Sequence, residues 1–408
     1  MFYEFPVIEH IDDVKAAIKD QKEFIVVERD WGYVVNYIIN MASTFDVSPE
    51  NYKNDIIKRE CRGIKFDKEG NILARPYHKF FNYGEKPETY EHTSKGHLIF
   101  EKLDGSMVHP ILTDREKKHW RLCTKMGITE VSMQAENWIT ENKKDNYVDF
   151  IMVSIYHNKV TPIFEWCSRQ NRIVIDYPKD RLVLTAIRDN VTGEYYSYED
   201  LVFIAESYDL DLVNVQFPNL DHNLPNIKAL TEYTKDLKDV EGFVVRYDNG
   251  HMIKIKADEY VSIHRVKADI MSEKNVIPIL LSDKFDDVIS MLPEGDRKNL
   301  IDFNLKFWQG IFANVVRFGK MYESFYKETN GDRKTFAIKY AKEIEKEEPY
   351  LKAYLFLRWG KDFSDQDTLN FITSTILRKC GSNAGVNEVR HLWNNHVYSI
   401  NNSGVEDV

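Results

Sequence analysis

The chain has 408 residues, of which 43% are hydrophobic and 29% are charged, as in an ordinary globular protein. The formal net charge of −10 argues against a protein that coats nucleic acid along its whole surface. A local basic cleft is still compatible with this charge, because phosphate contacts need only a few well-placed Lys and Arg residues. The length exceeds what one hydrophobic core usually supports, so we expect two domains or three.

The cysteines and the N-terminus indicate the cellular compartment in which the protein is expected to act. The four cysteines are far apart and form no C-x-x-C pair, which argues against a zinc site or a disulfide framework. The N-terminus MFYEFPVIEHIDD has no basic segment followed by an apolar one, and no apolar run is long enough to span a bilayer. We therefore expect a soluble protein of the reducing cytoplasm.

The first two thirds of the chain combine β-rich runs with shorter helical segments. We expect strands at residues 24–28, 33–39, 98–112, 120–124, 163–166, 172–177, 181–187 and 242–247. We expect helices at residues 128–142 and 198–208. Because the two kinds of element mix without strict βαβ alternation, the pattern predicts an α+β fold with antiparallel sheets.

After about residue 268 the apolar period becomes helical, which predicts a domain over residues 1–268 and an all-α domain over residues 269–408. Ser364 and Asp367 resemble a capping box, and Pro349 suits the first turn of another helix. The tail 401–408 is expected to fray. One long amphipathic helix is expected to bury Ile301, Leu305, Trp308, Phe312, Val315, Tyr322 and Tyr326.

The segment E-K-L-D-G-S is the first candidate for chemistry, because the chain has no P-loop and no G-x-G-x-x-G. It places Lys102, Asp104 and Gly105 in a hairpin. A lysine in such a place can attack a phosphorus or a carbonyl and form a covalent intermediate. Taken alone, a surface hairpin with a D-G turn is the simpler interpretation of this segment.

Two lysines follow a carboxylate further along the chain. The run V-E-G-F-V-V holds Glu241, and strand alternation in H-M-I-K-I-K puts Lys254 and Lys256 on one face. Two neighbouring ammonium groups repel each other unless an anion such as a triphosphate lies between them. The alternative is a solvated edge strand, on which lysines discourage aggregation.

A further carboxylate, Glu165, stands in the apolar strand P-I-F-E-W. A carboxylate there is costly unless it is satisfied. It could accept hydrogen bonds from ribose hydroxyls, or it could pair with Arg169 or Arg172.

Basic and aromatic residues interleave upstream of these motifs, which suits phosphate contacts beside base stacking. A strand end that packs on core phenylalanines is an equally good local explanation. Lys125 is expected on the strand that returns from the Lys102 hairpin. The histidines are scattered without ligand spacing and are taken as structural or surface residues. The interleaved residues are Arg62, Arg75, Lys79, Phe80 and Phe81.

The order K-L-D-G, F-E-W, V-E-G-F-V and K-I-K resembles the covalent nucleotidyltransferase superfamily of DNA ligases, RNA ligases and mRNA capping enzymes. The stretches E-C-R-G-I-K-F, R-P-Y-H-K-F-F-N and N-R-I-V-I-D-Y resemble the phage RNA ligase 1 family of T-even phage type. The resemblance covers roughly residues 20–265. After that it is weaker, with G-D-R-K-T-F-A as an echo of that family's helical domain.

The resemblance implies a role for each matching residue. Lys102 would take AMP from ATP, and Asp104 would act in the later steps. Gly105 would let the backbone approach the nucleotide, Glu165 would hold the ribose, and Glu241 would serve Mg²⁺ or Mn²⁺. Neighbouring cations would favour the neutral Lys102 amine. Arg62, Lys125, Lys254 and Lys256 would contact phosphates, and Lys79 and Phe81 match positions tied to activity.

The implied reaction joins a 5′-phosphate to a 3′-hydroxyl through lysyl-AMP and RNA-adenylate intermediates. The partners would be ATP and single-stranded RNA or nicked tRNA ends, bound by a monomer with no membrane contact. RNA selection by the helical domain, and a role in tRNA repair, are hypotheses. A DNA ligase or capping enzyme is an alternative, although both normally carry a β-rich domain after the K-x-K motif. A non-catalytic RNA-binding or phage assembly protein on the same fold is another.

Overall fold

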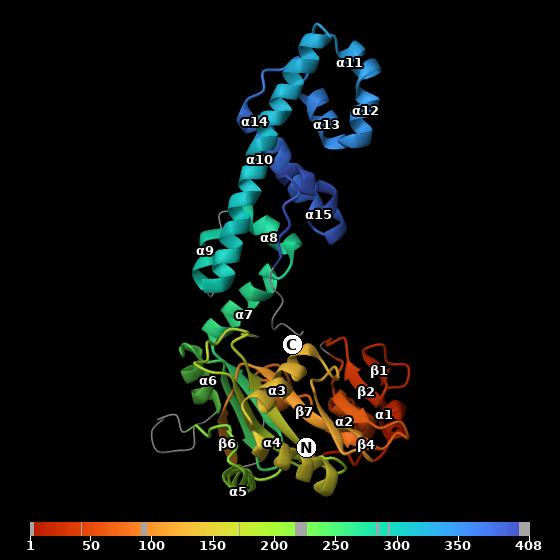
Figure 1. The fold of residues 1–408 in the computed structure, drawn as a ribbon, viewed down its shortest axis with the longest axis vertical. Coiled ribbons are helices and arrows are strands. Elements are labelled where there is room, and N and C mark those ends of the chain that lie inside the picture. The colour runs from red at the N-terminus through yellow and green to blue at the C-terminus, as the bar shows by residue number, and fades with distance from the viewer. Residues whose placement is uncertain are drawn as a thin grey trace. The chain divides into compact units, whose positions relative to one another are not determined.

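The computed structural model describes residues 4–41, 43–90, 96–170, 172–216, 227–282, 285–292 and 294–399. Two compact units are present, unit 1 up to Val261 and unit 2 from Ser262 (Figure 1). The expected frayed tail lies outside the described residues. The predicted boundary at residue 268 and the RNA-selecting role of the second part stay predictions.

Unit 1 contains three four-stranded sheets in its described residues. The first has the order β1-β2-β3-β4 and comprises β1 (Phe24–Arg29), β2 (Gly32–Tyr37), β3 (Arg62–Phe66) and β4 (Ile72–Ala74). The second has the order β10-β9-β7-β8 and comprises β7 (Ser106–Asp114), β8 (His119–Cys123), β9 (Val160–Cys167) and β10 (Arg181–Asp189). The third has the order β5-β12-β11-β6 and comprises β5 (Phe81–Asn82), β6 (His97–Glu101), β11 (Gly242–Tyr247) and β12 (Met252–Lys256). Except for the parallel pair β5–β12, neighbouring strands are antiparallel, which confirms the predicted fold class.

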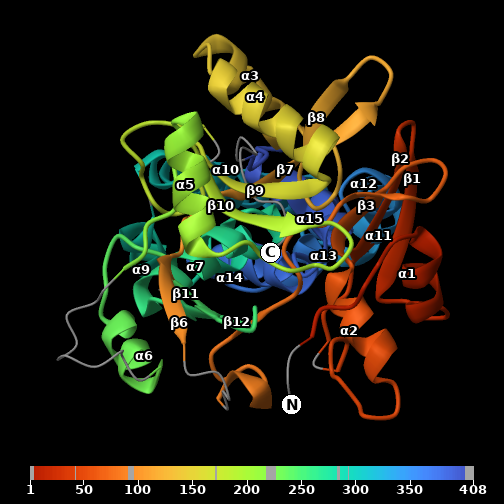
Figure 2. The same ribbon diagram turned by 90° about the horizontal axis from the view of Figure 1, so that it is seen from below.

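Helices cover the sheets of unit 1 and bury their apolar faces. Helices α3, α4 and α5 place Ala135, Ile151 and Leu201 in one core with Phe164 of β9, and α3 and α4 lie along β7–β9 in Figure 2. Helices α1 and α2 pack on the first sheet through Val14 and neighbouring apolar residues. The helices are α1 (Ile11–Ala17), α2 (Tyr52–Glu60), η1 (Pro87–Thr89), α3 (Glu130–Glu141), α4 (Asp145–Met152), the π-helix η2 (Val153–Asn158), α5 (Tyr198–Tyr208) and α6 (Ile227–Lys235).

Two strand predictions are wrong. The run 98–112 is broken at Lys102, and its two halves, β6 and β7, belong to different sheets. Residues 172–177 form no strand, because their backbone N–H groups bond to a side chain described below. The other predicted strands and both predicted helices of this region are confirmed within a few residues.

From α7 onwards the described residues form helices and no strand, as expected. No helix among the described residues has both the length and the apolar character needed to cross a membrane. The capping box at Ser364 and the helix start at Pro349 are confirmed. The helices are α7 (Asp258–Ile270), α8 (Glu273–Leu280), α9 (Phe285–Met291), α10 (Glu294–Glu328), α11 (Arg333–Lys339), α12 (Ala341–Glu347), α13 (Pro349–Arg358), α14 (Asp365–Lys379), α15 (Asn383–Val389) and η3 (Arg390–Trp393).

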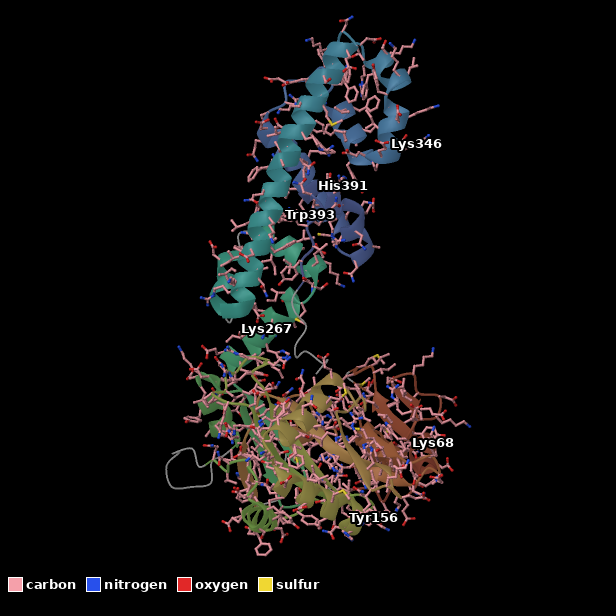
Figure 3. All side chains as sticks on the ribbon, viewed as in Figure 1. Lys68, Tyr156, Lys267, Lys346, His391 and Trp393 are labelled. Atoms are coloured by element: carbon pink, nitrogen blue, oxygen red, sulfur yellow. The ribbon has the colours of Figure 1, made fainter. Side chains whose placement is uncertain are left out.

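The long helix α10 forms the centre of unit 2, and its buried face overlaps the predicted one only in part. Val315 and Tyr322 belong to the core as predicted, whereas Ile301, Leu305 and Phe312 are 37%, 55% and 53% exposed. The other core residues of this helix include Leu300, Phe303, Phe307, Ile311 and Phe318. Phe307 packs against the ring of Trp393, which is labelled in Figure 3, at a centroid distance of 5.3 Å.

Candidate active site

The loop from Lys102 to Gly105 connects β6 of the third sheet to β7 of the second, so it lies where the two sheets meet. A cavity of about 370 Å³ opens at this junction between strands of both sheets. It brings together every predicted site residue except Phe81. The predicted residues on its wall are Arg62, Lys79, Lys102, Asp104, Gly105, Lys125, Glu165, Glu241, Lys254 and Lys256.

Lys102 forms an ion pair with the buried Glu241. The distance from Lys102 Nζ to Glu241 Oε1 is 2.6 Å, and Lys256 Nζ lies 3.1 Å from the same oxygen. The sheet register explains this arrangement, because Gly242 pairs with Lys256 on β12 and its carbonyl accepts the Lys102 N–H at 2.9 Å. Neighbouring strand ends thus place two ammonium groups on one carboxylate.

The pKa of Lys102 is shifted upwards, and the lysine of this site with a lowered pKa is Lys254. Burial alone would lower the pKa of Lys102, but the carboxylates of Glu241, Glu165 and Asp104 outweigh burial and raise that pKa above its ordinary value. The neighbouring lysines therefore do not outweigh these carboxylates, and the expectation that the lysines together with Mg²⁺ favour the neutral Lys102 amine stays a prediction. Burial, followed by repulsion from Lys102, Lys79 and Arg62, instead holds the pKa of Lys254 well below its ordinary value.

Glu165 lies on β9, opposite this ion pair. Burial, reinforced by the nearby Glu241 carboxylate, raises the pKa of Glu165 to about 8, although Lys102 and Arg62 oppose the shift. The side chain is therefore mostly protonated at neutral pH and can both donate and accept a hydrogen bond, as a ribose contact requires. Of the two arginines considered as partners, Arg172 forms an ion pair with Asp176 at 3.1 Å.

The side chain of Asp104 binds the loop of residues 172–177 to the segment from Lys102 to Gly105. Its Oδ2 accepts hydrogen bonds from the N–H groups of Val174 at 2.7 Å and Ile175 at 2.6 Å, and its Oδ1 accepts the Tyr260 hydroxyl at 2.7 Å. The Asp104 N–H in turn donates to the hydroxyl of Tyr177 at 2.8 Å. These contacts take the place of a strand ladder at residues 172–177, and no local pattern in the sequence indicates them.

Asp104→Asn is expected to loosen this loop. An amide has one acceptor oxygen in place of two, so a donor on the loop or on Tyr260 loses its partner, at a cost of about 1–3 kcal/mol. We expect faster amide hydrogen exchange at residues 172–177 and a lower unfolding free energy. Asp114→Asn is the matched control, since Asp114 forms an exposed ion pair with Lys117 at the other end of β7. Equal exchange in the two variants would contradict this role.

Gly105 is required by strand packing. A Cβ atom at this position would lie 2.6 Å from the carbonyl oxygen of Trp166 and 3.0 Å from Cγ of Glu165. Trp166 and Glu165 belong to β9, which pairs with β7 immediately after the glycine. The close approach of two strands thus explains this glycine, and its predicted contact with the nucleotide stays a prediction.

Three cations converge on Tyr37, a residue that the motifs did not single out. The Nζ atoms of Lys79 and Lys125 lie 5.1 and 5.8 Å from the centre of its ring. Burial would raise the pKa of Tyr37, but Arg62, Lys79 and Lys125 outweigh it and lower that pKa. Lys125 itself lies in the tight turn after β8 rather than on a strand, because Thr124 and Gly127 bond to each other. This end of the cavity suits a polyanion.

Two upstream residues lie away from the cavity. Phe81 is 2% exposed in the core of the first sheet, with Lys79 Nζ 5.6 Å from its ring, so it supports Lys79 rather than lining the cavity. Arg75, considered as a phosphate ligand, is fully buried and pairs with Glu60 at 3.1 Å. The aromatic residues of this segment that line the cavity are Tyr77 and Phe80.

The cavity lining also has apolar and aromatic residues, and of these the sequence motifs identified only Phe80. A flat heterocycle suits such residues, beside which lies the guanidinium of Arg246. They include Tyr77, Phe80, Phe100, Val213 and Val244, and Thr185 also lines the cavity. Cations and aromatic rings in one cavity match the phosphates and the base of a nucleotide.

A divalent metal ion would find few protein ligands here. The described residues contain no group of three or more His, Cys, Asp or Glu side chains suited to a metal. Magnesium is commonly held by one or two carboxylates together with substrate phosphates and water. The Glu241 carboxylate, at the cationic part of the cavity, fits that mode of binding.

The sequence relatives of this chain are named as RNA ligases. A family described as RNA ligase matches residues 60–260, which fall within unit 1. A protein of Thermovibrio ammonificans, named as a candidate RNA ligase, is 28% identical over 349 residues, or 83% of this chain and 86% of that protein. The RNA ligase of Rhodothermus phage RM378 is 24% identical, over 71% of this chain and 78% of its own length.

Among solved structures, a candidate ATP-dependent DNA ligase from Aquifex aeolicus covers 83% of this chain and 80% of its own, with 14% identity and a TM-score of 0.41. The two sequence relatives share a higher sequence identity with this chain than that structure does. Residues 60–260 of the chain thus match the RNA ligase family, and both relatives that align with most of the chain are named as RNA ligases.

Proposed function

We propose that this protein is an ATP-dependent RNA ligase that carries AMP covalently on Lys102. The observation that carries the proposal is the position of Lys102, 2.6 Å from Glu241 inside a cavity lined by both cations and aromatic rings. The adenine would lie against the aromatic rings, and Glu165 would contact the ribose. The β- and γ-phosphates would lie among the cations Arg62, Lys79, Lys125 and Lys254.

The first step transfers AMP to the protein. The Lys102 ammonium gives up a proton, its Nζ bonds to the α-phosphorus of ATP, and the α–β phosphoanhydride bond breaks to release pyrophosphate. Lys254 and Lys256 stabilise the charge that develops on the phosphates. A bound Mg²⁺ or Mn²⁺ would neutralise further phosphate charge beside Glu241. AMP then passes to an RNA 5′-phosphate, and a 3′-hydroxyl displaces AMP as the strands join.

The pH profile of the first step should reflect the raised pKa of Lys102. Only the neutral amine attacks, so the single-turnover rate is expected to rise about tenfold per pH unit below that pKa. Glu241→Gln removes the main group that raises the pKa, so its profile should move to lower pH, with a smaller plateau. Quench-flow measurement from pH 6 to 10 would test this expectation. Glu136→Gln, at an ion pair with Arg121 outside the cavity, should leave the profile unchanged.

The proposal is tested by incubating the purified protein with α-labelled ATP and Mg²⁺, denaturing it, and looking for label and for a mass increase of one AMP. RNA with a 5′-phosphate should then be ligated, and dephosphorylated RNA should not. A folded protein that binds ATP but acquires no label, and was not already adenylated, would favour a non-catalytic RNA-binding or assembly role. Labelling by GTP, or sealing of nicked duplex DNA only, would favour a capping or DNA-joining enzyme.

The proposal extends to a monomer that acts in the cytoplasm on single-stranded RNA or nicked tRNA. Equal ligation rates on a cleaved tRNA anticodon loop and on generic single strands would contradict a specialised tRNA repair role. The proposed selection of RNA by unit 2 would be tested by the same comparison after substitutions on the surface of that unit.

A further inference from the structure

Lys65, on β3, is a buried lysine outside the cavity lining. Its side chain is 0% exposed, and its Nζ donates to the carbonyl oxygens of Gly63 at 2.7 Å and Thr124 at 2.9 Å. None of the ion pairs between described residues includes Lys65. Burying an ammonium group without a carboxylate partner is expensive, so its two carbonyl contacts need an explanation.

The surroundings of Lys65 do not relieve this cost. The neighbouring His109 is fully buried, and neither of its ring nitrogens has a hydrogen-bond partner among the described residues. Burial lowers the pKa of Lys65 to about 8, and the Cys123 thiol offsets the shift only in part. Burial, with repulsion from Lys65 and Arg62, keeps the pKa of His109 well below its usual value, so His109 is neutral.

The two carbonyl groups belong to backbone segments that carry cavity residues. Val35 pairs with Ile64 and Asn36 with Arg62, so β3 bulges at Gly63, which has a φ of +85°. A Cβ atom on Gly63 would lie 2.6 Å from both Cα and the carbonyl oxygen of Lys125. The bulge therefore touches the backbone of the turn that presents Lys125, and it directly follows Arg62 in the chain.

We propose that Lys65 is a positioning residue that joins the Gly63 bulge to the Thr124–Gly127 turn and thereby sets the spacing of Arg62 and Lys125 for a polyphosphate. The proposal rests on the proposed function only in taking ATP phosphates as the ligand of that end of the cavity. Lys65 touches no substrate in this arrangement. It acts through two cations, Arg62 at the start of β3 and Lys125 in the turn after β8, which repel each other until an anion binds.

The test compares Lys65→Met with the wild type, after AMP is removed with pyrophosphate and the protein is desalted. Met has a similar length but no donor, so the bulge and the turn lose their link while the apolar contacts remain. We expect pyrophosphate to bind at least about tenfold more weakly, because displacements near 1 Å cost on the order of 10²-fold in such sites. Adenosine should bind with unchanged affinity, and KM for ATP should rise more than kcat falls.

Lys68→Met is the matched control, because Lys68 follows the same strand but is exposed and pairs with Glu28 at 2.9 Å (Figure 3). Lys65→Gln keeps a shorter donor, and it should bind pyrophosphate with an affinity between those of Met and the wild type. It also serves as the test if Lys65→Met does not fold. Unchanged pyrophosphate binding, or an equal loss for adenosine and pyrophosphate, would overturn the proposal. If the wild type binds neither ligand, the proposed function fails as well.

Discussion

Lys102→Ala is expected to lower AMP transfer to the protein by a factor on the order of 10³ or more. The reason is that Lys102 lies in the loop at the junction of the two sheets, where it pairs with Glu241, whereas the other cavity lysines lie on β12 or in separate segments. Labelling with α-labelled ATP, followed by denaturation and mass spectrometry, measures the effect. Glu241 keeps its contact with Lys256 at 3.1 Å in the variant, so folding should be preserved.

A substrate that bypasses the first step provides the control. RNA that already carries a 5′-adenylate needs no lysyl-AMP, so Lys102→Ala should still join it to a 3′-hydroxyl. The exposed Lys68→Ala should behave like the wild type in both assays. Substantial label on Lys102→Ala would move the nucleophile to another lysine, and Lys256 would be examined first. Loss of both reactions in a folded variant would indicate that Lys102 shapes the cavity rather than carrying AMP.

Glu60→Gln is expected to lower the unfolding free energy of the protein by about 3–5 kcal/mol, because it leaves two buried guanidinium groups without a counter-charge. Glu60 is 2% exposed, and its Oε2 lies 2.7 Å from Arg188 Nη1 and 3.1 Å from Arg75 Nε. The same arginines donate to the carbonyls of Pro76 and Pro6 at 2.7 Å. The network therefore joins Glu60 at the end of α2 to Arg75, which follows β4, and to Arg188 of β10.

The pH dependence of stability provides a second measurement on this variant. Burial would raise the pKa of Glu60, but Arg188 and Arg75 outweigh it and hold the pKa at about 2. A depressed carboxyl pKa contributes stability that is fully present above the unfolded value, near 4.3, and is lost as pH falls toward 2. Urea unfolding at pH 7 and pH 3 should therefore show a smaller acid loss for Glu60→Gln than for the wild type.

Glu28→Gln is the control, because Glu28 is exposed and its ion pair with Lys68 should contribute at most about 1 kcal/mol. A Glu60→Gln protein as stable as Glu28→Gln at pH 7 would contradict the interpretation of Glu60 as the counter-charge of this network.

Local periodicity was enough to predict part of the site. Strand alternation put Lys254 and Lys256 on one face of β12, and both residues line the cavity. The reason is that side-chain direction along a strand depends on the strand alone. The strand prediction for residues 172–177 failed, and the local pattern left the role of Arg75 open, because long-range partners decide both. One segment gives its N–H groups to Asp104, and the guanidinium of Arg75 is held by Glu60.

Long-range partners also explain why the motifs did not identify some cavity residues. Tyr37 and Tyr260 carry no local signal of function, since each is an ordinary tyrosine within a strand or helix. Their importance comes from partners far away in sequence, the three cations around Tyr37 and the carboxylate of Asp104 for Tyr260. On α10, a competing apolar stripe that includes Leu300 and Phe303 made the buried face ambiguous from sequence, and tertiary packing chose between the two stripes.

The two walls of the cavity come from sheets that share no strand. The ion pair of Lys102 with Glu241 lies at the β6–β11–β12 edge, whereas Thr185 and Glu165 stand on β10 and β9. Mutations of Glu165 or Thr185 in the second sheet can therefore alter that wall while the Lys102 amine keeps its contact with Glu241. Such an architecture allows one wall of the cavity to change in evolution separately from the ion pair on the other, and it offers an engineer the same separation.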